Sequence, residues 1–363
     1  MSSLSCGIVG LPNVGKSTIF SALTNAAVES ANYPFTTIEP NIAIVDVPDK
    51  RLASLYKLLE SKKIVPTTLK FVDIAGLVQG ASKGEGLGNK FLGNIREVDS
   101  IAHVLRCFKG DVTHVLESID PIRDLEIINL ELAISDLQII EKRILKLDKL
   151  KRSGDKEAMK EFNLVKKIED MLNKNQSINT SMDFDIEESR IIKSMNLIST
   201  KPTIYILNYG NESIEQEEII KLKKAIHDKS HSYVEIYGLL ENEIKDLDND
   251  DKELFLKEYN VSETGLNLLI NKSYSILNLI TYYTAGKEET RAWSIMNNTR
   301  APEAAGKIHS DFQKGFIRAE IIEYQDYMDL ESEEAAKNKG LMRSEGKDYI
   351  VKDGDIIHFR YNV

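Results

Sequence analysis

The sequence is poor in cysteine and lacks a long apolar run. It has two cysteines among 363 residues, Cys6 and Cys107, and both lie in apolar, strand-like runs. This favours two reduced core thiols over a disulfide. No run of about 18 apolar residues occurs, so no membrane span is expected. Residues 1–4 lead directly into a strand-like run, so no signal peptide is expected. These features predict a cytoplasmic protein.

Positive charge is also scarce. The chain has 57 acidic and 47 basic residues and a formal net charge of -10. This balance argues against a protein that coats nucleic acid, and no DNA partner is expected. One local basic face could still dock on a ribonucleoprotein. The length predicts two or three domains with a substantial core.

One strong motif is present, GLPNVGKST at residues 10–18, between a strand-like run and a helical pattern. The spacing G-x-x-x-x-G-K-S is typical of a phosphate-binding loop, or P-loop. Backbone N–H groups and a helix N-terminus bind phosphate oxygens there. Lys16 would act in catalysis by reaching the β- and γ-phosphates, and Ser17 would bind Mg²⁺. The predicted nucleotide-binding residues of this loop are Asn13, Val14, Gly15, Lys16, Ser17 and Thr18.

A second motif, DIAG at residues 73–76, ends another strand-like run. In open α/β sheets, ligands bind at such strand ends. Asp73 would hold Mg²⁺, and Gly76 would offer its N–H to the γ-phosphate. The next residue is Leu77, where Ras-like switches place a glutamine that orients the attacking water. Leucine cannot orient water, so another group must do so.

Two segments are predicted to be switch loops. Residues 32–40 lie between the helical pattern and the second strand-like run, and Thr37 is favoured over Thr36 as a Mg²⁺ ligand that responds to the γ-phosphate. Residues 80–89 are dense in glycine and follow the DIAG motif, which predicts a mobile second switch.

Four stretches together resemble the Obg-related P-loop NTPases and, more narrowly, the YchF/Obg-like ATPase branch. They are residues 10–18, 32–37, 73–78 and 80–89. The resemblance implies a hydrophobic residue in place of the catalytic glutamine, as at Leu77. It also implies association with the ribosome in translation or stress response. Asn13 resembles an asparagine that binds K⁺ in potassium-stimulated relatives, so K⁺ is a candidate cofactor beside Mg²⁺.

His114, in the loop at residues 109–114, is the candidate for activating water. A neutral imidazole could orient or deprotonate a water molecule. A packing or surface histidine explains the same residue equally well.

The base-reading loop is unusual. No N-K-x-D follows any strand-like run, so the aspartate that recognises guanine is missing, which favours ATP over GTP. The resembled branch has N-x-x-E at this place, whereas here Gly210 is an extra residue. Either Asn208 reads the base, as an asparagine can pair with adenine, or Asn211 and Glu212 shift inward.

Alternating strand-like and helical segments at residues 1–122 and 201–277 predict an α/β nucleotide-binding domain with a mostly parallel sheet. Residues 123–200 carry apolar residues at helical spacing with a break at residues 153–155, which predicts an antiparallel, coiled-coil-like hairpin inserted into that domain. Residues 278–363 mix short strands with a helix. They resemble the TGS domain, which has a β-grasp fold.

The leading hypothesis is a Mg²⁺-dependent P-loop nucleotidase that hydrolyses ATP slowly and acts as a switch on the ribosome. One alternative is a nucleotide-gated module that binds the ribosome or RNA and whose hydrolysis is incidental. The other is a conventional GTPase, against which the missing N-K-x-D argues.

Overall fold

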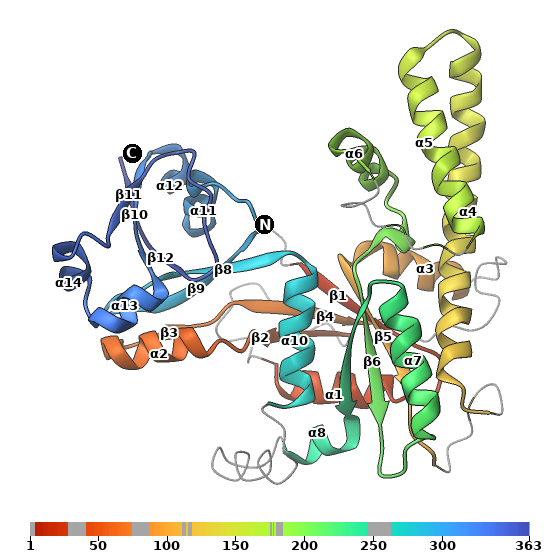
Figure 1. Ribbon diagram of the computed structural model, residues 1–363, viewed down its shortest axis with the longest axis horizontal. Helices are drawn as coiled ribbons and strands as arrows, with labels where there is room; N and C mark the ends of the chain where they lie inside the picture. The colour runs from red at the N-terminus through yellow and green to blue at the C-terminus, as the bar shows by residue number, and fades with distance from the viewer. Residues whose placement is uncertain are drawn as a thin grey trace. The chain divides into compact units, whose positions relative to one another are not determined.

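The structure is a computed structural model with two compact units (Figure 1). One unit comprises Met1–Ile44 and Lys70–Leu269, and the other comprises Val45–Leu69 and Ile270–Val363. The described residues are 4–27, 41–74, 87–110, 114, 118–174, 176, 178, 184–244 and 263–362.

The first unit is built on a six-stranded sheet with the strand order β2-β4-β1-β5-β6-β7. The strands are β1 Ser5–Val9, β2 Ile42–Asp46, β4 Thr68–Asp73, β5 Ser100–Arg106, β6 Thr203–Tyr209 and β7 Ser232–Tyr237. The four pairs β4–β1, β1–β5, β5–β6 and β6–β7 are parallel. Their carboxyl ends therefore lie at one edge, where such sheets bind ligands. β1 and β5 are buried along their whole length, as expected for strands covered on both faces.

Helices flank this sheet (Figure 1). They are α1 Lys16–Asn25, α3 Leu87–Glu97, α7 Gln216–Asp228 and α8 Gly238–Ile244. A further helix, α10 Gly265–Ile276, begins in this unit and ends in the other. The predicted α/β class with a mostly parallel sheet is confirmed.

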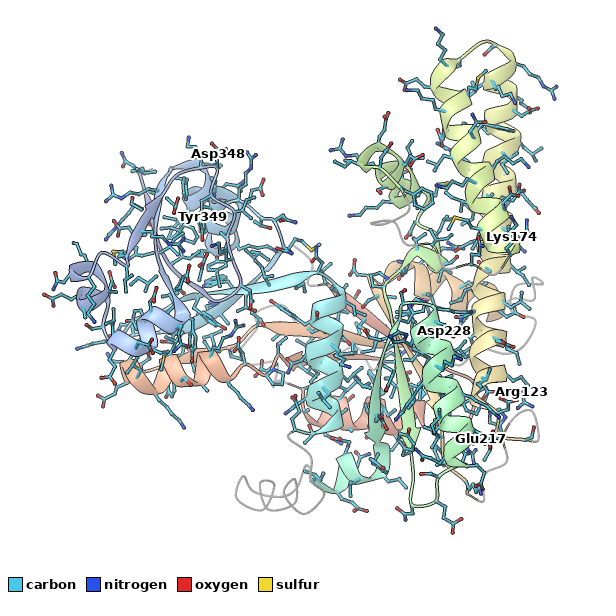
Figure 2. All side chains as sticks on the ribbon, in the orientation of Figure 1. Arg123, Lys174, Glu217, Asp228, Asp348 and Tyr349 are labelled. Carbon is cyan, nitrogen blue, oxygen red and sulfur yellow. The ribbon has the colours of Figure 1, made fainter. Side chains whose placement is uncertain are left out.

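A long helical hairpin is inserted between β5 and β6. It consists of α4 Pro121–Arg152 and α5 Lys156–Asn173, and α6 Ile186–Met195 and a short 3₁₀ helix at Ile198–Thr200 follow. Gly154 makes the turn with φ of 87°, and Asp155 caps α5 by accepting hydrogen bonds from Glu157 N and Ala158 N. Ile140 and Val165 are fully buried in the seam between the helices. Figure 2 labels Arg123 in the first turn of α4 and Lys174 just beyond α5, so both ends of the hairpin can be followed there.

The second unit is built on a mixed sheet with the strand order β11-β10-β12-β8-β9-β3. Its strands are β3 Ile64–Val65, β8 Leu279–Thr284, β9 Thr290–Met296, β10 Phe316–Glu323, β11 Arg343–Glu345 and β12 Asp355–Tyr361. Its helices are α2 Lys50–Leu59, α11 Ala301–Ile308, α12 Ser310–Lys314, α13 Tyr324–Leu330 and α14 Glu333–Asn338. Mixed strands packed with a few short helices match the predicted α+β character.

The boundary of this second unit differs from the predicted one. The sequence predicts residues 45–69 and 270–277 as part of the nucleotide-binding domain, whereas both segments belong to the second compact unit. The reason is non-local packing. β3 pairs with β9 in parallel, and Leu52 and Leu55 of α2 lie in one apolar cluster with Tyr283 of β8.

Cys6 and Cys107 are both buried and make no disulfide. Burial is the main cause that raises the pKa of the Cys107 thiol to about 12. Within the described part of the chain, no helix is long and apolar enough to cross a membrane.

Candidate nucleotide-binding site

The loop between β1 and α1 has the backbone that a phosphate cradle needs. Gly15 caps α1 in a left-handed conformation with φ of 89°, and a Cβ at this position would lie 2.1 Å from Asn208 Nδ2. Only glycine suits both demands. α1 then begins at Lys16, so the N-terminal amides of a ten-residue helix follow the loop directly.

Lys16 and Asp73 meet beside this loop. β1 and β4 are parallel with Ile8 opposite Asp73, so the carboxylate lies at the same sheet edge as the loop. The Lys16 ammonium donates to Asp73 Oδ1 in a short ion pair. The side chains are 11% and 20% exposed. The structure therefore brings together two residues that are 57 positions apart in the chain and that the sequence assigned to phosphate and Mg²⁺ binding.

The donor set suits Mg²⁺. Ser17 is exposed at the start of α1 and offers a hydroxyl, and Asp73 offers a carboxylate at the neighbouring strand end. Both are hard oxygen donors, which Mg²⁺ prefers, and Mg²⁺ commonly binds through few protein ligands plus substrate phosphates. Among the described residues, no group of three or more His, Cys, Asp and Glu side chains could hold a metal. Thr37, Gly76 and Leu77 lie outside the described residues.

A cavity of about 630 Å³ opens at the cradle. One side is the loop from Leu11 to Thr18, and the other comes from the ends of β5, β6 and β7. Residues that line this other side are Phe108, Asn208, Tyr209, Gly210 and Leu239. The volume is typical of small-molecule sites.

Asn208 lies at the centre of the site, but its side chain is already engaged. Its Nδ2 donates to the Val14 carbonyl at 2.9 Å, and its Oδ1 accepts from Gly238 N at 3.1 Å. Asn208 is buried, whereas Asn211 and Glu212 are both exposed. The Asn208 side chain therefore links the phosphate loop at Val14 to the start of α8 at Gly238. The inward shift of Asn211 and Glu212 is not seen.

His114 lies in a buried pair with Asp124. Its Nε2 lies 2.8 Å from Asp124 Oδ2, and both side chains are 1% exposed. Burial is the main cause that raises the pKa of Asp124, and His114 opposes this shift. His114 is not among the described residues that line the cavity.

Two residues of the site, Arg106 and Phe108, are not predicted from the sequence. Arg106 donates to the Asn13 carbonyl, and Phe108 lines the cavity. One signal was available for Arg106, since it is a charged residue that ends a largely apolar run at a predicted strand end. Phe108 carries no such signal.

The domain is a P-loop nucleoside triphosphatase domain by its geometry. The phosphate loop joins a strand to a helix that begins with Lys16, the Asp73 carboxylate lies at the adjacent strand end, and a cavity of nucleotide size opens beside them. The comparisons agree with this class. A family model described as "50S ribosome-binding GTPase" matches residues 5–142. A second, YchF-GTPase_C, described as "Protein of unknown function (DUF933)", matches residues 279–362.

Curated relatives match over nearly the whole chain. "Ribosome-binding ATPase YchF" of Haemophilus influenzae is 50% identical over 360 residues, which cover 99% of each chain. The Bacillus subtilis protein of the same name is 47% identical over 366 residues, covering 99% of this chain and 100% of the relative. A solved structure, the Schizosaccharomyces pombe YchF GTPase, superposes with a TM-score of 0.89 at 37% identity, covering 99% of this chain and 98% of that one. The chain belongs to the YchF family.

Proposed function

We propose that this chain is a Mg²⁺-dependent ATPase that binds the ribosome in the cytoplasm and uses its nucleotide as a switch. The observation that carries the proposal is the meeting of Lys16 and Asp73 at the phosphate loop. The relatives that are 50% and 47% identical carry the name ribosome-binding ATPase, which supports the nucleotide and the partner.

Each residue of the cradle has a chemical task in this proposal. The loop amides and Lys16 bind and neutralise the phosphates, and Ser17 and Asp73 would hold Mg²⁺ together with Thr37. Bound Mg²⁺ supplies charge neutralisation at the β- and γ-phosphates. Gly76 would donate its N–H to the γ-phosphate.

Base selection follows from what the described residues offer. Glu212 is exposed, and no aspartate or glutamate is among the described residues that line the cavity, so no described carboxylate is placed to recognise guanine. We therefore expect ATP to bind more tightly than GTP. A contact of Asn208 with the base would require its bonds to Val14 and Gly238 to open, and contacts from Asn211 and Glu212 would require these exposed side chains to turn inward. A measured preference for GTP would overturn this assignment.

His114 is proposed to orient water, which requires its contact with Asp124 to open because the imidazole is 1% exposed. His114→Ala should then slow hydrolysis at unchanged ATP affinity, and an unchanged rate removes the role. Asn13 is exposed at the cavity and is proposed to bind K⁺. Equal rates in K⁺ and Na⁺ remove that role.

The test of the switch is ribosome binding with ATP, with ADP and without nucleotide. The proposal expects affinities that differ among the three conditions, because nucleotide-dependent loops present different surfaces. Identical binding in all three would leave ribosome docking and hydrolysis as separate activities.

A further inference from the structure

The carboxyl end of β5 holds a buried arginine behind the phosphate loop. Arg106 is 1% exposed. Its Nη1 donates to the Asn13 carbonyl oxygen at 3.2 Å, and its Nε donates to the Phe108 carbonyl oxygen at 3.1 Å. Its guanidinium carbon lies 4.5 Å from the centroid of the Phe108 ring. One side chain therefore joins the loop after β1 to the segment after β5.

A second side chain holds the next carbonyl of the same loop. β5 and β6 pair in parallel with Arg106 opposite Asn208, and Asn208 Nδ2 donates to the Val14 carbonyl at 2.9 Å. A loop whose N–H groups face a phosphate turns carbonyls to its other side, and buried carbonyls require donors. Arg106 and Asn208 supply these donors for the consecutive residues Asn13 and Val14.

The backbone at Asn13 needs such support. Its φ is 65°, in the left-handed region that residues other than glycine visit rarely. A backbone of this kind persists where the surrounding contacts fix it. Because the guanidinium of Arg106 is a rigid fork, it can bind two carbonyls at once and set the distance between them.

The charge of Arg106 has a further consequence. Burial lowers the pKa of its guanidinium, and the nearby Asp124 carboxylate opposes this shift. Arginine nevertheless stays protonated in proteins, so the buried charge is permanent. A neutral donor could satisfy one carbonyl at a smaller desolvation cost. A fixed positive charge behind the loop attracts phosphate more strongly than it would in water.

We propose that Arg106 is a positioning residue for the nucleotide phosphates, which holds the Asn13 carbonyl and places a fixed positive charge behind the phosphate loop. The inference rests on the proposed nucleotide binding. If Arg106 acts on the phosphates and not on the base, its loss lowers the affinity for ATP and the affinity for GTP by the same factor.

The test compares Arg106→Gln, Arg106→Lys and the control Arg143→Gln, whose arginine pairs with Glu161 on the hairpin. Fluorescent ATP and GTP analogues give the affinities, steady-state kinetics gives kcat and KM, and thermal melting shows whether each variant is folded. We expect Arg106→Gln to lower the affinities for ATP and for GTP in parallel, each by about tenfold or more. Arg106→Lys should recover only part of this loss, because an ammonium keeps the charge but lacks the fork. The affinities of the control, Arg143→Gln, should stay within about twofold of the wild-type values.

Three results would overturn the inference while wild-type protein still binds ATP. One is ATP affinity within about twofold of wild type in Arg106→Gln. Another is a loss for ATP and GTP that differs by more than about threefold, which would place the effect at the base through Phe108. The third is full recovery in Arg106→Lys. If Arg106→Gln does not fold, the lysine variant decides alone, and unchanged affinity then contradicts the inference. Failure of the wild-type chain to bind ATP would instead contradict the proposed function.

Discussion

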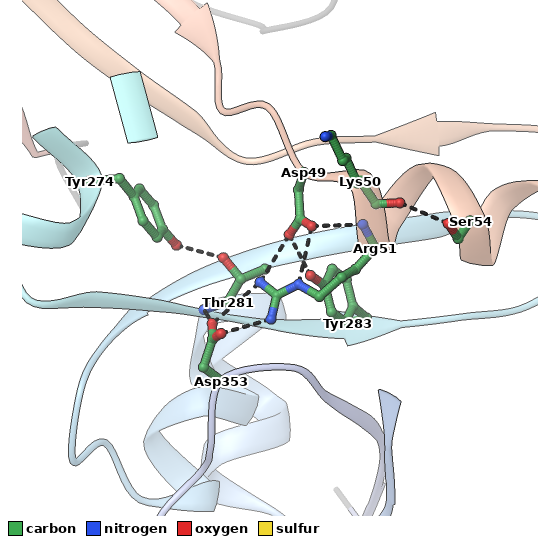
Figure 3. Close-up of polar contacts among 8 residues, drawn as sticks. All are labelled: Asp49, Lys50, Arg51, Ser54, Tyr274, Thr281, Tyr283 and Asp353. Carbon is green, nitrogen blue, oxygen red and sulfur yellow. Dashed lines mark hydrogen bonds and ion pairs between the residues drawn. The ribbon is translucent and has the colours of Figure 1, made fainter. Parts of the chain in front are cut away.

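Arg106 ends strand β5 in the first unit and Arg51 lies in the first turn of helix α2 in the second, and the two arginines have different partners. Arg106, in the first unit, donates to the main-chain carbonyls of Asn13 and Phe108. Arg51, in the second unit, donates to the carboxylates of Asp49 and Asp353 (Figure 3). Two carboxylates pair with Arg51, whereas Arg106 bonds two main-chain carbonyls and has the Asp124 carboxylate nearby. We expect the Arg51 network to stabilise the fold, and we propose that Arg106 serves the nucleotide.

The Arg51 network explains why residues 45–69 belong to the C-terminal unit. Asp49 caps α2 by accepting from Arg51 N and also accepts a short hydrogen bond from the Tyr283 hydroxyl. Asp353 accepts from Thr281 N at 2.9 Å and from Arg51. Burial alone would lower the pKa of Arg51, but its hydrogen bonds to Asp353 and Asp49 outweigh this and raise it. Burial, followed by Asp49, raises the pKa of Tyr283.

The largest expected effect is the loss of ATP hydrolysis when Lys16 of the phosphate loop is replaced. Lys16→Ala removes the ammonium that would neutralise the β- and γ-phosphates, so kcat/KM for ATP should fall by about a hundredfold or more. Phosphate release measured at several ATP concentrations tests this. The control is Lys224→Ala, whose lysine is exposed on α7. Hydrolysis at the wild-type rate in Lys16→Ala would show that the cradle does not do the chemistry.

Asp49→Ala should affect stability and spare catalysis. It removes a helix cap and the acceptor of Tyr283 and Arg51, and we expect the C-terminal unit to lose about 2–3 kcal/mol of unfolding free energy. Urea unfolding measures this, with the highly exposed Asp348 replaced by alanine as the control. KM for ATP should stay within about twofold. A change of KM well beyond about twofold would contradict the proposed separation of the two kinds of network.

The smallest effect concerns Glu320 on β10, which lies between two arginines. Its hydrogen bond to Arg360 is the largest cause that lowers its pKa, and Arg318 adds to this. A carboxyl whose folded pKa is lowered stabilises the fold above its unfolded pKa of about 4.3, and this stability is lost as pH falls through the folded pKa. Glu320→Gln should therefore cost about 0.5–1 kcal/mol at pH 7. The difference from wild type should shrink toward pH 3 in unfolding experiments. A constant difference at all pH values would mean that packing, not charge, is responsible.

The phosphate-binding part of the site could be predicted from local pattern. The glycine and lysine spacing at residues 10–18 and the strand end at Asp73 are adjacent or periodic features, and the structure brings Lys16 and Asp73 together. The helical hairpin could be predicted for the same reason, since its apolar spacing and the break at residues 153–155 are local. Such features follow from the period of helices and strands.

The parts that could not be predicted depend on partners distant in the chain. Arg106 donates to a main-chain carbonyl 93 positions away. Because every residue has a main-chain carbonyl, the sequence does not reveal which one accepts this hydrogen bond. Asn208 could equally have read the base until its bonds to Val14 and Gly238 were known. The position of β3 beside β9 depends on a pairing across more than 220 residues, so no local pattern assigns residues 45–69 to the C-terminal unit.

Calorimetric titration of ATP into the wild-type chain and into Lys16→Ala, both with Mg²⁺, tests the central assignment most directly. The account predicts one saturable ATP site per wild-type chain and a loss of that site in Lys16→Ala. Absence of saturable binding in the wild-type chain, or equal binding in both proteins, would contradict it.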